Sequence, residues 1–214
     1  MALITGPLPF PAQGLYAITP DLEWPPDVLA EQVGRAIAGG ARVIQHRCKN
    51  PDKRFVEAEA LVPICRSAGV PLIINDDVDL ALDLGADGVH LGKDDAGLMK
   101  ARKKTGPGFI IGISCYDSID RALSAQAQGA SYVAFGRFFP SRTKPTAPLA
   151  HLETLHEARQ RLLVPIVAIG GITPDNGRVL LEAGAAVLAV IEGIFGEADV
   201  EQAARRFQPL FASE

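Results

Sequence analysis

The sequence predicts an α/β protein that folds as a single-domain (β/α)8 TIM barrel, and two patterns support this prediction. In the first, a Gly-Ala pair follows a helix-like stretch and opens a strand-like one, at Gly40, Gly85, Gly129 and Gly184. Glycine suits the left-handed position just after a helix. In the second, short apolar runs lie between these repeats, which is typical of parallel strands buried on both faces. Each interval is long enough for two strand–helix units.

The expected strands run along the whole chain. They lie near residues 14–19, 42–48, 71–76, 88–92, 109–115, 132–137, 165–170 and 187–192. Apolar or small residues at helical spacing indicate helices across 29–37, 58–65, 117–126 and 149–162, the third of them capped by Asp117. We therefore expect an N-terminal extension over residues 1–13, the barrel over 14–207 and a C-terminal tail over 208–214.

The alternative architecture is an open, doubly wound sheet. Such a sheet usually carries a glycine-rich turn after its first strand. Here Thr19, Pro20 and Asp21 follow the first expected strand. The barrel is therefore favoured over the open sheet.

Composition and charge narrow the class of protein. A length of 214 residues fits one domain, and 48% hydrophobic with 21% charged residues excludes a disordered chain. The net charge of −4 argues against a nucleic-acid partner, and no apolar run suggests a membrane partner. The first basic residue is Arg35, which excludes a secretory signal with a positive start, and three cysteines without metal-binding spacing suit a reduced, cytoplasmic protein. The sequence is compatible with a homo-oligomer.

Polar side chains collect where the expected strands end, and this is the edge at which barrel enzymes carry their chemistry. Gln45, Arg47 and Lys49 alternate at the end of the second expected strand, so a strand would point all three the same way. Two cations and an amide suit a phosphorylated ligand. A strand end that simply emerges into solvent would show the same alternation.

Two further groups of residues suit a phosphorylated substrate. Asp76 and Asp95 follow neighbouring expected strands, and carboxylates from separate loops suit Mg²⁺, although an aspartate there can also be only a helix N-cap. Ser141, Thr143 and Lys144 lie in a long loop, and hydroxyls with a lysine bind phosphate, although an ordinary polar turn has the same composition.

The last two strand ends occupy the usual phosphate site of a barrel. Gly170 and Gly171 end the seventh expected strand, and Glu192 and Gly193 end the eighth; two tight turns remain the alternative. His90 suits an acid/base or ring-stacking role, although an isolated histidine is more often structural. No Ser-His-Asp order, zinc spacing or P-loop occurs. The residues alone therefore predict a barrel enzyme for phosphorylated small molecules.

Seven short motifs follow one another as in the thiamine-phosphate synthase family, and the chain resembles that family from about residue 14 to residue 195. The motifs are Gly14–Thr19, Gln45–Lys49, Ile74–Asp76, Gly88–Gly92 with Asp95, Gly112–Ser114, Ser141–Pro145 and Ala168–Ile172. The resemblance implies a transferase that joins a pyrimidine diphosphate to a thiazole phosphate, or to its carboxylated form, and releases diphosphate. It implies that diphosphate leaves first with the help of Mg²⁺, and that the thiazole nitrogen then attacks the pyrimidine-stabilised cation.

The resemblance also implies a role for each matching residue. Tyr16, Gln45 and His90 would line the pyrimidine pocket; Arg47, Lys49, Asn75 and Lys144 would hold the diphosphate, with Ser114 beside it; Asp76 and Asp95 would bind Mg²⁺; Ser141, Thr143, Gly171, Ile191 and Glu192 would take the thiazole phosphate. Lys144, Ser114 and Arg47 would be catalytic, because they would stabilise the departing charge.

The chain departs from the family pattern at a few positions. Ser141 stands where threonine is common and keeps the hydroxyl. His46 and Cys48 vary between the pocket-facing side chains, so we expect both to face away from the pocket. Glu192 stands where serine is frequent, and a carboxylate beside a phosphate is unfavourable unless it points outward. Two alternatives stay open: a tautomerase-like paralogue that acts on the thiazole without coupling, and a barrel that binds ligand without turnover.

Overall fold

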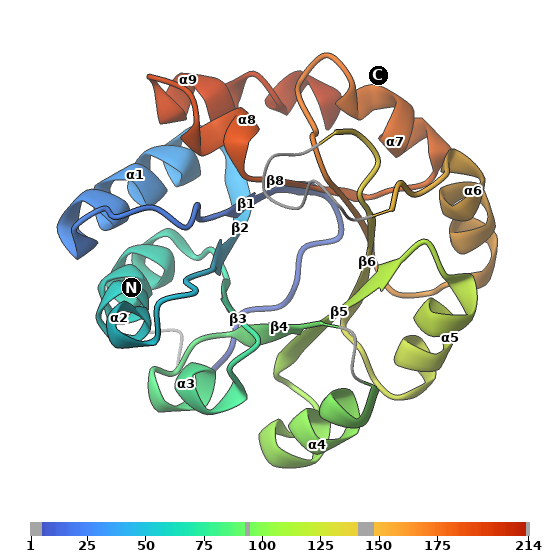
Figure 1. Ribbon diagram of the computed structural model, residues 1–214, viewed down its shortest axis with the longest axis horizontal. Helices are drawn as coiled ribbons and strands as arrows, with labels where there is room; N and C mark the ends of the chain where they lie inside the picture. Colours follow the sequence, from blue (N-terminus) through green and yellow to red (C-terminus); the bar gives the residue numbers. More distant parts are fainter. Residues whose placement is uncertain (1–5, 93–94, 141–147, 213–214) are drawn as a thin grey trace.

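A computed structural model of the chain, which describes residues 6–92, 95–140 and 148–212, shows eight parallel strands that close into one barrel (Figure 1). Each strand pairs with the next along the chain, and the last pairs with the first. The helices form a ring outside the strands. The predicted (β/α)8 barrel is therefore confirmed.

The strands lie within a few residues of the expected ranges. They are β1 (Gly14–Ile18), β2 (Ala41–His46), β3 (Leu72–Asn75), β4 (Gly88–Leu91), β5 (Ile110–Tyr116), β6 (Tyr132–Gly136), β7 (Ile166–Ile169) and β8 (Val187–Val190). The helices are α1 (Pro26–Ala38), α2 (Pro51–Ala68), α3 (Val78–Asp83), α4 (Asp95–Thr105), α5 (Ile119–Ala127), α6 (Leu152–Arg161), α7 (Gly177–Ala183), α8 (Glu192–Phe195) and α9 (Val200–Arg205), followed by the 3-10 turn η1 (Gln208–Leu210). Of Asp95 and Ala96, only the backbone is described.

The repeated glycines have the backbone conformation that the sequence pattern predicts. Gly40, Gly85, Gly129 and Gly184 all have positive φ values, between 64° and 127°. Each connects a helix to the strand that follows it, so the repeat marks four of the helix-to-strand turns.

The expected cap of α5 is wrong by one residue. Ser118 caps this helix, because its side chain accepts a hydrogen bond from the backbone N–H of Arg121. Asp117 instead holds the start of α6, where it accepts hydrogen bonds from the backbone N–H of His151 at 3.0 Å and from the Thr154 hydroxyl at 2.6 Å. Sequence spacing alone cannot distinguish a cap from a contact with the next helix.

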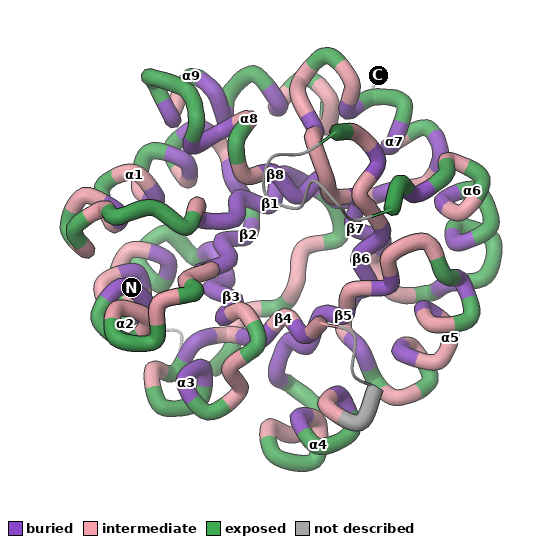
Figure 2. The backbone as a smooth tube through the Cα atoms, in the orientation of Figure 1, coloured by how far each residue is buried: buried purple, intermediate pink, exposed green. Residues whose placement is uncertain are grey.

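The strands consist mostly of buried residues, as Figure 2 shows for the centre of the molecule, and these residues divide between an outer and an inner cluster. Along β1, Leu15 and Ala17 pack outward among the helices, whereas Tyr16 and Ile18 point into the barrel. The barrel interior is filled mainly by aliphatic side chains, with Tyr16 and Tyr132 among them. This two-sided burial explains why the strands read as continuous apolar runs. Within the described residues, no helix is long and apolar enough to cross a membrane.

The segment before β1 covers the end of the barrel at which the strands start (Figure 1). The backbone N–H of Leu8 donates a hydrogen bond to the Asp87 carboxylate at 2.7 Å, in the turn before β4. The Phe10 ring stacks on Tyr132 with 4.0 Å between ring centroids. These contacts tie the segment to the interior side chains of the barrel.

We predict that Gly112→Ala destabilises the barrel strongly. Gly112 lies in β5 beneath Tyr132, and a Cβ atom there would lie 1.9 Å from Cζ of the tyrosine ring. Overpacking of this kind costs about 1–3 kcal/mol or more. The free energy of unfolding, measured by urea denaturation, should fall accordingly.

The matched control is Gly34→Ala in α1. The nearest atom to a Cβ at this position is 3.9 Å away, on Ile64. Alanine in a helix interior is about 0.5–1 kcal/mol more favourable than glycine, so this variant should be slightly more stable than the parent. Equal effects of the two variants would contradict the argument.

Candidate active site

A cavity of about 660 Å³ opens where the strands of the barrel end. This volume is typical of a site for a small molecule. Several of the sequence-predicted residues line it: Tyr16, Gln45, Arg47, Lys49, Asn75, Asp76, His90, Ser114, Gly171, Ile191 and Glu192. The strand-end pattern therefore led to residues that share one cavity.

Four of the predicted site residues cannot be compared with the structure. Ser141, Thr143 and Lys144 lie outside the described residues, and the Asp95 side chain does too. The backbone of Asp95 begins α4.

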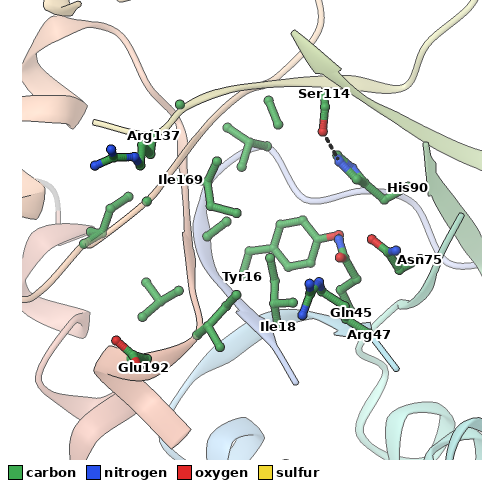
Figure 3. A pocket seen from close by; sticks show the side chains of 18 of the residues that line it. Tyr16, Ile18, Gln45, Arg47, Asn75, His90, Ser114, Arg137, Ile169 and Glu192 are labelled. Atoms are coloured by element: carbon green, nitrogen blue, oxygen red, sulfur yellow. Dashed lines mark hydrogen bonds between the residues drawn. The ribbon is translucent and has the colours of Figure 1, made fainter. Parts of the chain in front are cut away.

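Five polar side chains form a continuous hydrogen-bonded chain across the barrel. The Gln45 amide donates to the Tyr16 hydroxyl at 2.7 Å, and that hydroxyl lies 2.9 Å from the hydroxyl of Tyr132. The Tyr132 hydroxyl lies 2.9 Å from Nδ1 of His90, and Nε2 of His90 lies 2.9 Å from the Ser114 hydroxyl (Figure 3). These hydrogen bonds link β2, β1, β6, β4 and β5. Gln45, Tyr16, His90 and Ser114 line the cavity as its polar floor, and Tyr132 joins them from beneath.

The hydrogen bonds from Gln45 to Ser114 can all be donated in the same direction. Both tyrosines are almost fully buried, and burial raises the pKa of each hydroxyl, so both stay protonated. In one arrangement that satisfies every contact, Tyr16 accepts from Gln45 and donates to Tyr132, and Tyr132 donates to Nδ1 of His90. In that arrangement Nε2 of His90 carries a proton and donates it to the Ser114 hydroxyl. The hydroxyl proton of Ser114 can therefore point into the cavity.

The two aspartates after β3 have different roles. Asp77 is the N-cap of α3: its carboxylate accepts from the backbone N–H of Leu80 at 2.9 Å and pairs with Arg54 at 3.0 Å. The expectation that Asp76 could be only a helix cap is thereby excluded. Asp76 has a φ of 63°, in the left-handed region, and lines the cavity. Strained backbone of this kind often accompanies a functional site.

The Asp76 carboxylate and backbone are both held in place. The Asn75 amide donates to the carboxylate at 2.7 Å, and the backbone N–H of Asp76 donates to the carbonyl of His90 at 2.8 Å. The second hydrogen bond joins Asp76 to His90, whose side chain is part of the polar floor. An oxygen donor of this kind suits a hard cation such as Mg²⁺.

The cationic residues lie just past β2 rather than within it. The strand ends at His46, so Arg47 and Lys49 do not follow Gln45 on one strand as the alternation implies. They line the cavity because the segment is held to the loop after β1: the backbone N–H of Arg47 donates to Thr19 at 2.9 Å, and that of Lys49 donates to Asp21 at 3.1 Å.

The lining residues that were not predicted as part of the site include Arg137, Arg54 and Tyr116. Arg137 follows β6, on the side of the cavity opposite Arg47 (Figure 3). Arg54 comes from α2, and Tyr116 lies in β5 next to a shift in strand register. The position of Arg137 directly after a strand could have indicated it as a site residue, whereas no local sequence pattern marks Arg54.

The glycines after β7 are explained by close packing. A Cβ atom on Gly170 would lie 2.2 Å from Cβ of Arg137, and one on Gly171 would lie 2.2 Å from the carbonyl oxygen of Pro140. Both glycines also have positive φ. The tight-turn alternative therefore accounts for their identity, and they still line the cavity. Glu192, at the start of α8, is exposed at the same end of the barrel.

The departures at His46 and Cys48 have different outcomes. His46 faces away from the cavity, where its ring lies 3.0 Å from the Glu57 carboxylate of α2. Cys48 is among the residues that line the cavity, but its sulfur lies within 4.8 Å of the ligand atoms of His46 and Glu57, behind the cavity wall. Because the chain has already left β2 at Cys48, strand alternation alone does not set the direction of this side chain.

Comparison with known proteins is consistent across sequence and structure. A family model described as thiamine monophosphate synthase matches residues 15–194. A thiamine-phosphate synthase from Methylococcus capsulatus is 52% identical over 95% of this chain and 92% of its own length, and one from Nitrosococcus oceani is 50% identical over 94% of each. The solved structure of a thiamine phosphate pyrophosphorylase from Pyrococcus furiosus has a TM-score of 0.83 and 35% identity, and covers 94% of this chain and 96% of its own.

We predict that Tyr132→Phe lowers the free energy of unfolding by about 1–3 kcal/mol. The substitution keeps the ring but removes one hydrogen bond from the buried Tyr16 hydroxyl and one from Nδ1 of His90. Urea denaturation measures the loss. In a double-mutant cycle, Tyr16→Phe combined with Tyr132→Phe should cost less than the sum of the single variants, because both partners are then removed. Strict additivity would show that the two hydroxyls do not interact.

Proposed function

The chain belongs to the thiamine monophosphate synthase family, and from that premise we propose how its residues perform the reaction. It is a transferase that couples 4-amino-2-methyl-5-(diphosphooxymethyl)pyrimidine with 4-methyl-5-(2-phosphooxyethyl)thiazole, or with its carboxylated form, to give thiamine phosphate and diphosphate. Its substrates are small phosphorylated molecules. The family and its relatives do not favour a tautomerase-like or non-catalytic protein.

One observation carries the assignment of roles. Arg47, Lys49 and Asn75 lie at the same mouth of the cavity as the Asp76 carboxylate, and the polar floor from Gln45 to Ser114 lies below them. Cations, an amide and a carboxylate at one mouth suit a diphosphate with its counter-ion.

The floor is the proposed pocket for the pyrimidine ring. Tyr16 presents a buried aromatic ring, and Gln45 and His90 present polar groups whose directions are fixed by their hydrogen bonds. A heteroaromatic ring needs this combination of a flat apolar contact and a few oriented polar atoms. The pyrimidine would therefore lie with its diphosphate arm toward Arg47.

The proposed chemical step is diphosphate departure followed by attack of the thiazole nitrogen. The carbon–oxygen bond breaks and its electron pair leaves with the diphosphate; the nitrogen lone pair then forms the new carbon–nitrogen bond. Arg47 and the Ser114 hydroxyl, with Lys144 from outside the described residues, act as catalytic groups by stabilising the negative charge on the leaving oxygen. Lys49 and Asn75 help to hold the diphosphate. In this order of steps, no side chain has to remove a proton from a carbon atom.

The donor set at the mouth fits Mg²⁺. Asp76 offers carboxylate oxygen, oriented by Asn75, and we propose Asp95 as the second carboxylate. When bound, Mg²⁺ would supply charge neutralisation for the diphosphate oxygens. Asp76 would hold it from a strained backbone position that the contact with His90 keeps in place.

The thiazole phosphate is proposed to bind at the opposite wall. Gly171, Ile191 and Glu192 line this part, and Ser141 and Thr143 are proposed to contribute hydroxyls. Arg137 adds a cation on the same side. Because Glu192 is exposed, we expect its backbone rather than its carboxylate to serve the phosphate.

A product assay with matched aspartate variants tests the roles at the mouth. With both substrates and Mg²⁺, the protein should form thiamine phosphate, detected by mass; EDTA should abolish the product and added Mg²⁺ restore it. Asp76→Asn should slow turnover about a hundredfold. The control Asp77→Asn keeps a good helix cap and should change the rate far less. Equal losses in the two variants would remove Asp76 from the proposed metal site.

A second prediction concerns Glu192. Glu192→Ser should leave the KM for thiazole phosphate equal or lower, because it removes a negative charge near the proposed phosphate position. Steady-state kinetics with the pyrimidine substrate held saturating measures this value. A tenfold rise in KM would show instead that the carboxylate makes a needed contact.

A further inference from the structure

Behind the cavity wall, three side chains with metal-binding atoms meet between β2 and α2. They are His46, Cys48 and Glu57, and their ligand atoms all lie within 4.8 Å of one another. Nε2 of His46 is 3.0 Å from a carboxylate oxygen of Glu57. The cluster is distinct in chemistry from the proposed Mg²⁺ site, because it offers nitrogen and sulfur as well as oxygen.

The carboxylate of this cluster is buried beside a neutral partner. Glu57 is 6% exposed and His46 is 1% exposed. Burial lowers the pKa of His46, so the ring is uncharged at neutral pH. The neighbouring cations form ion pairs elsewhere, Arg54 with Asp77 and Lys53 with Glu23. Buried charges in proteins are usually paired or coordinate a metal, so Glu57 lies in a place that suits a cation.

We propose that His46, Cys48 and Glu57 form a binding site for a borderline-soft divalent cation such as Zn²⁺. Imidazole, thiolate and carboxylate are the three ligand types that Zn²⁺ takes in proteins, whereas Mg²⁺ prefers oxygen alone. Three protein ligands leave one tetrahedral position for water. A central point among atoms spaced in this way lies within about 3 Å of each, so shifts of about 1 Å reach zinc–ligand distances.

Binding changes the protons of two ligands in a defined way. The sulfur–hydrogen bond of Cys48 breaks, a sulfur–metal bond forms, and the proton leaves to solvent. Burial raises the pKa of this thiol to about 11, so the metal must displace a proton that is otherwise held. The His46 proton moves from Nε2 to Nδ1. Among the described residues Nδ1 has no hydrogen-bond partner, so we expect weaker binding than at a complete structural zinc site.

The site is joined to the active-site mouth through the backbone. Cys48 lies between Arg47 and Lys49 in sequence and itself lines the cavity. A cation that holds Cys48 against α2 would therefore restrain the segment that carries both cationic residues.

Cobalt is the probe for this proposal. The full chain, kept in excess Mg²⁺ so that oxygen-only sites are filled, is titrated with Co²⁺ while the thiolate-to-cobalt charge-transfer absorption is followed. We expect one Co²⁺ per chain with this absorption, and its displacement by Zn²⁺. The absence of the charge-transfer band in the parent protein would overturn the proposal.

Variants assign the ligands. Cys48→Ser should abolish the band, and His46→Gln and Glu57→Gln should each weaken Co²⁺ binding by at least about tenfold. The control is Cys65→Ala, a buried cysteine of the helix that carries Glu57, which should bind Co²⁺ as the parent does. Far-UV circular dichroism establishes that each variant is folded. An unchanged band in folded Cys48→Ser, or its loss in Cys65→Ala alone, would refute the site.

Discussion

The hydrogen bond between the Tyr16 and Tyr132 hydroxyls, buried inside the barrel, is the constraint on which the site depends. A hydroxyl in this apolar interior must be paired, since leaving it unpaired costs about 1–3 kcal/mol. The pairing is secured from below, where Phe10 stacks on Tyr132, and from the side, where Gly112 leaves room for the phenol. The two hydroxyls in turn orient the polar groups above them. Gln45 is bonded to Tyr16, and His90, which is bonded to Tyr132, also contacts Ser114. Packing at one end of the barrel thereby sets polar geometry at the other.

Asp76 and Asp77, which follow β3, differ in role: one is explained by the structure of the fold, and the other is proposed to act in the site. Asp77 satisfies the first turn of α3 and pairs with Arg54, so it has a complete structural explanation. Asp76 has none of these duties, yet it occupies a left-handed backbone position that costs free energy. Its contact with the carbonyl of His90 ties it to the tyrosine-based floor. The strained residue and the oriented floor therefore belong to one unit.

The sequence predicts the architecture well because the information is local. Glycines after helices and apolar strand runs report backbone conformation and two-sided burial, and both were found. The sequence predicts the contents of the cavity because every parallel strand ends at the same edge. It cannot predict the link between Tyr16 and Tyr132, which are 116 residues apart and meet only when the barrel closes. Short helices such as α3, α7 and α9 were also missed, since six or seven residues show no clear helical period.

The end of β2 shows where the pattern rule fails and why the failure is informative. Alternation holds while the chain is extended, so Gln45 faces the barrel interior and His46 faces α2. After His46 the strand has ended, and hydrogen bonds that the backbone N–H groups of Arg47 and Lys49 donate to Thr19 and Asp21 set the path of the chain instead. That change of path lets Arg47 and Cys48, although consecutive, both line the cavity. It also leaves the sulfur of Cys48 close to a pair of buried side chains behind the wall. One short segment thus contributes to two chemically different sites, one suited to anions in the cavity and one suited to a soft cation behind it.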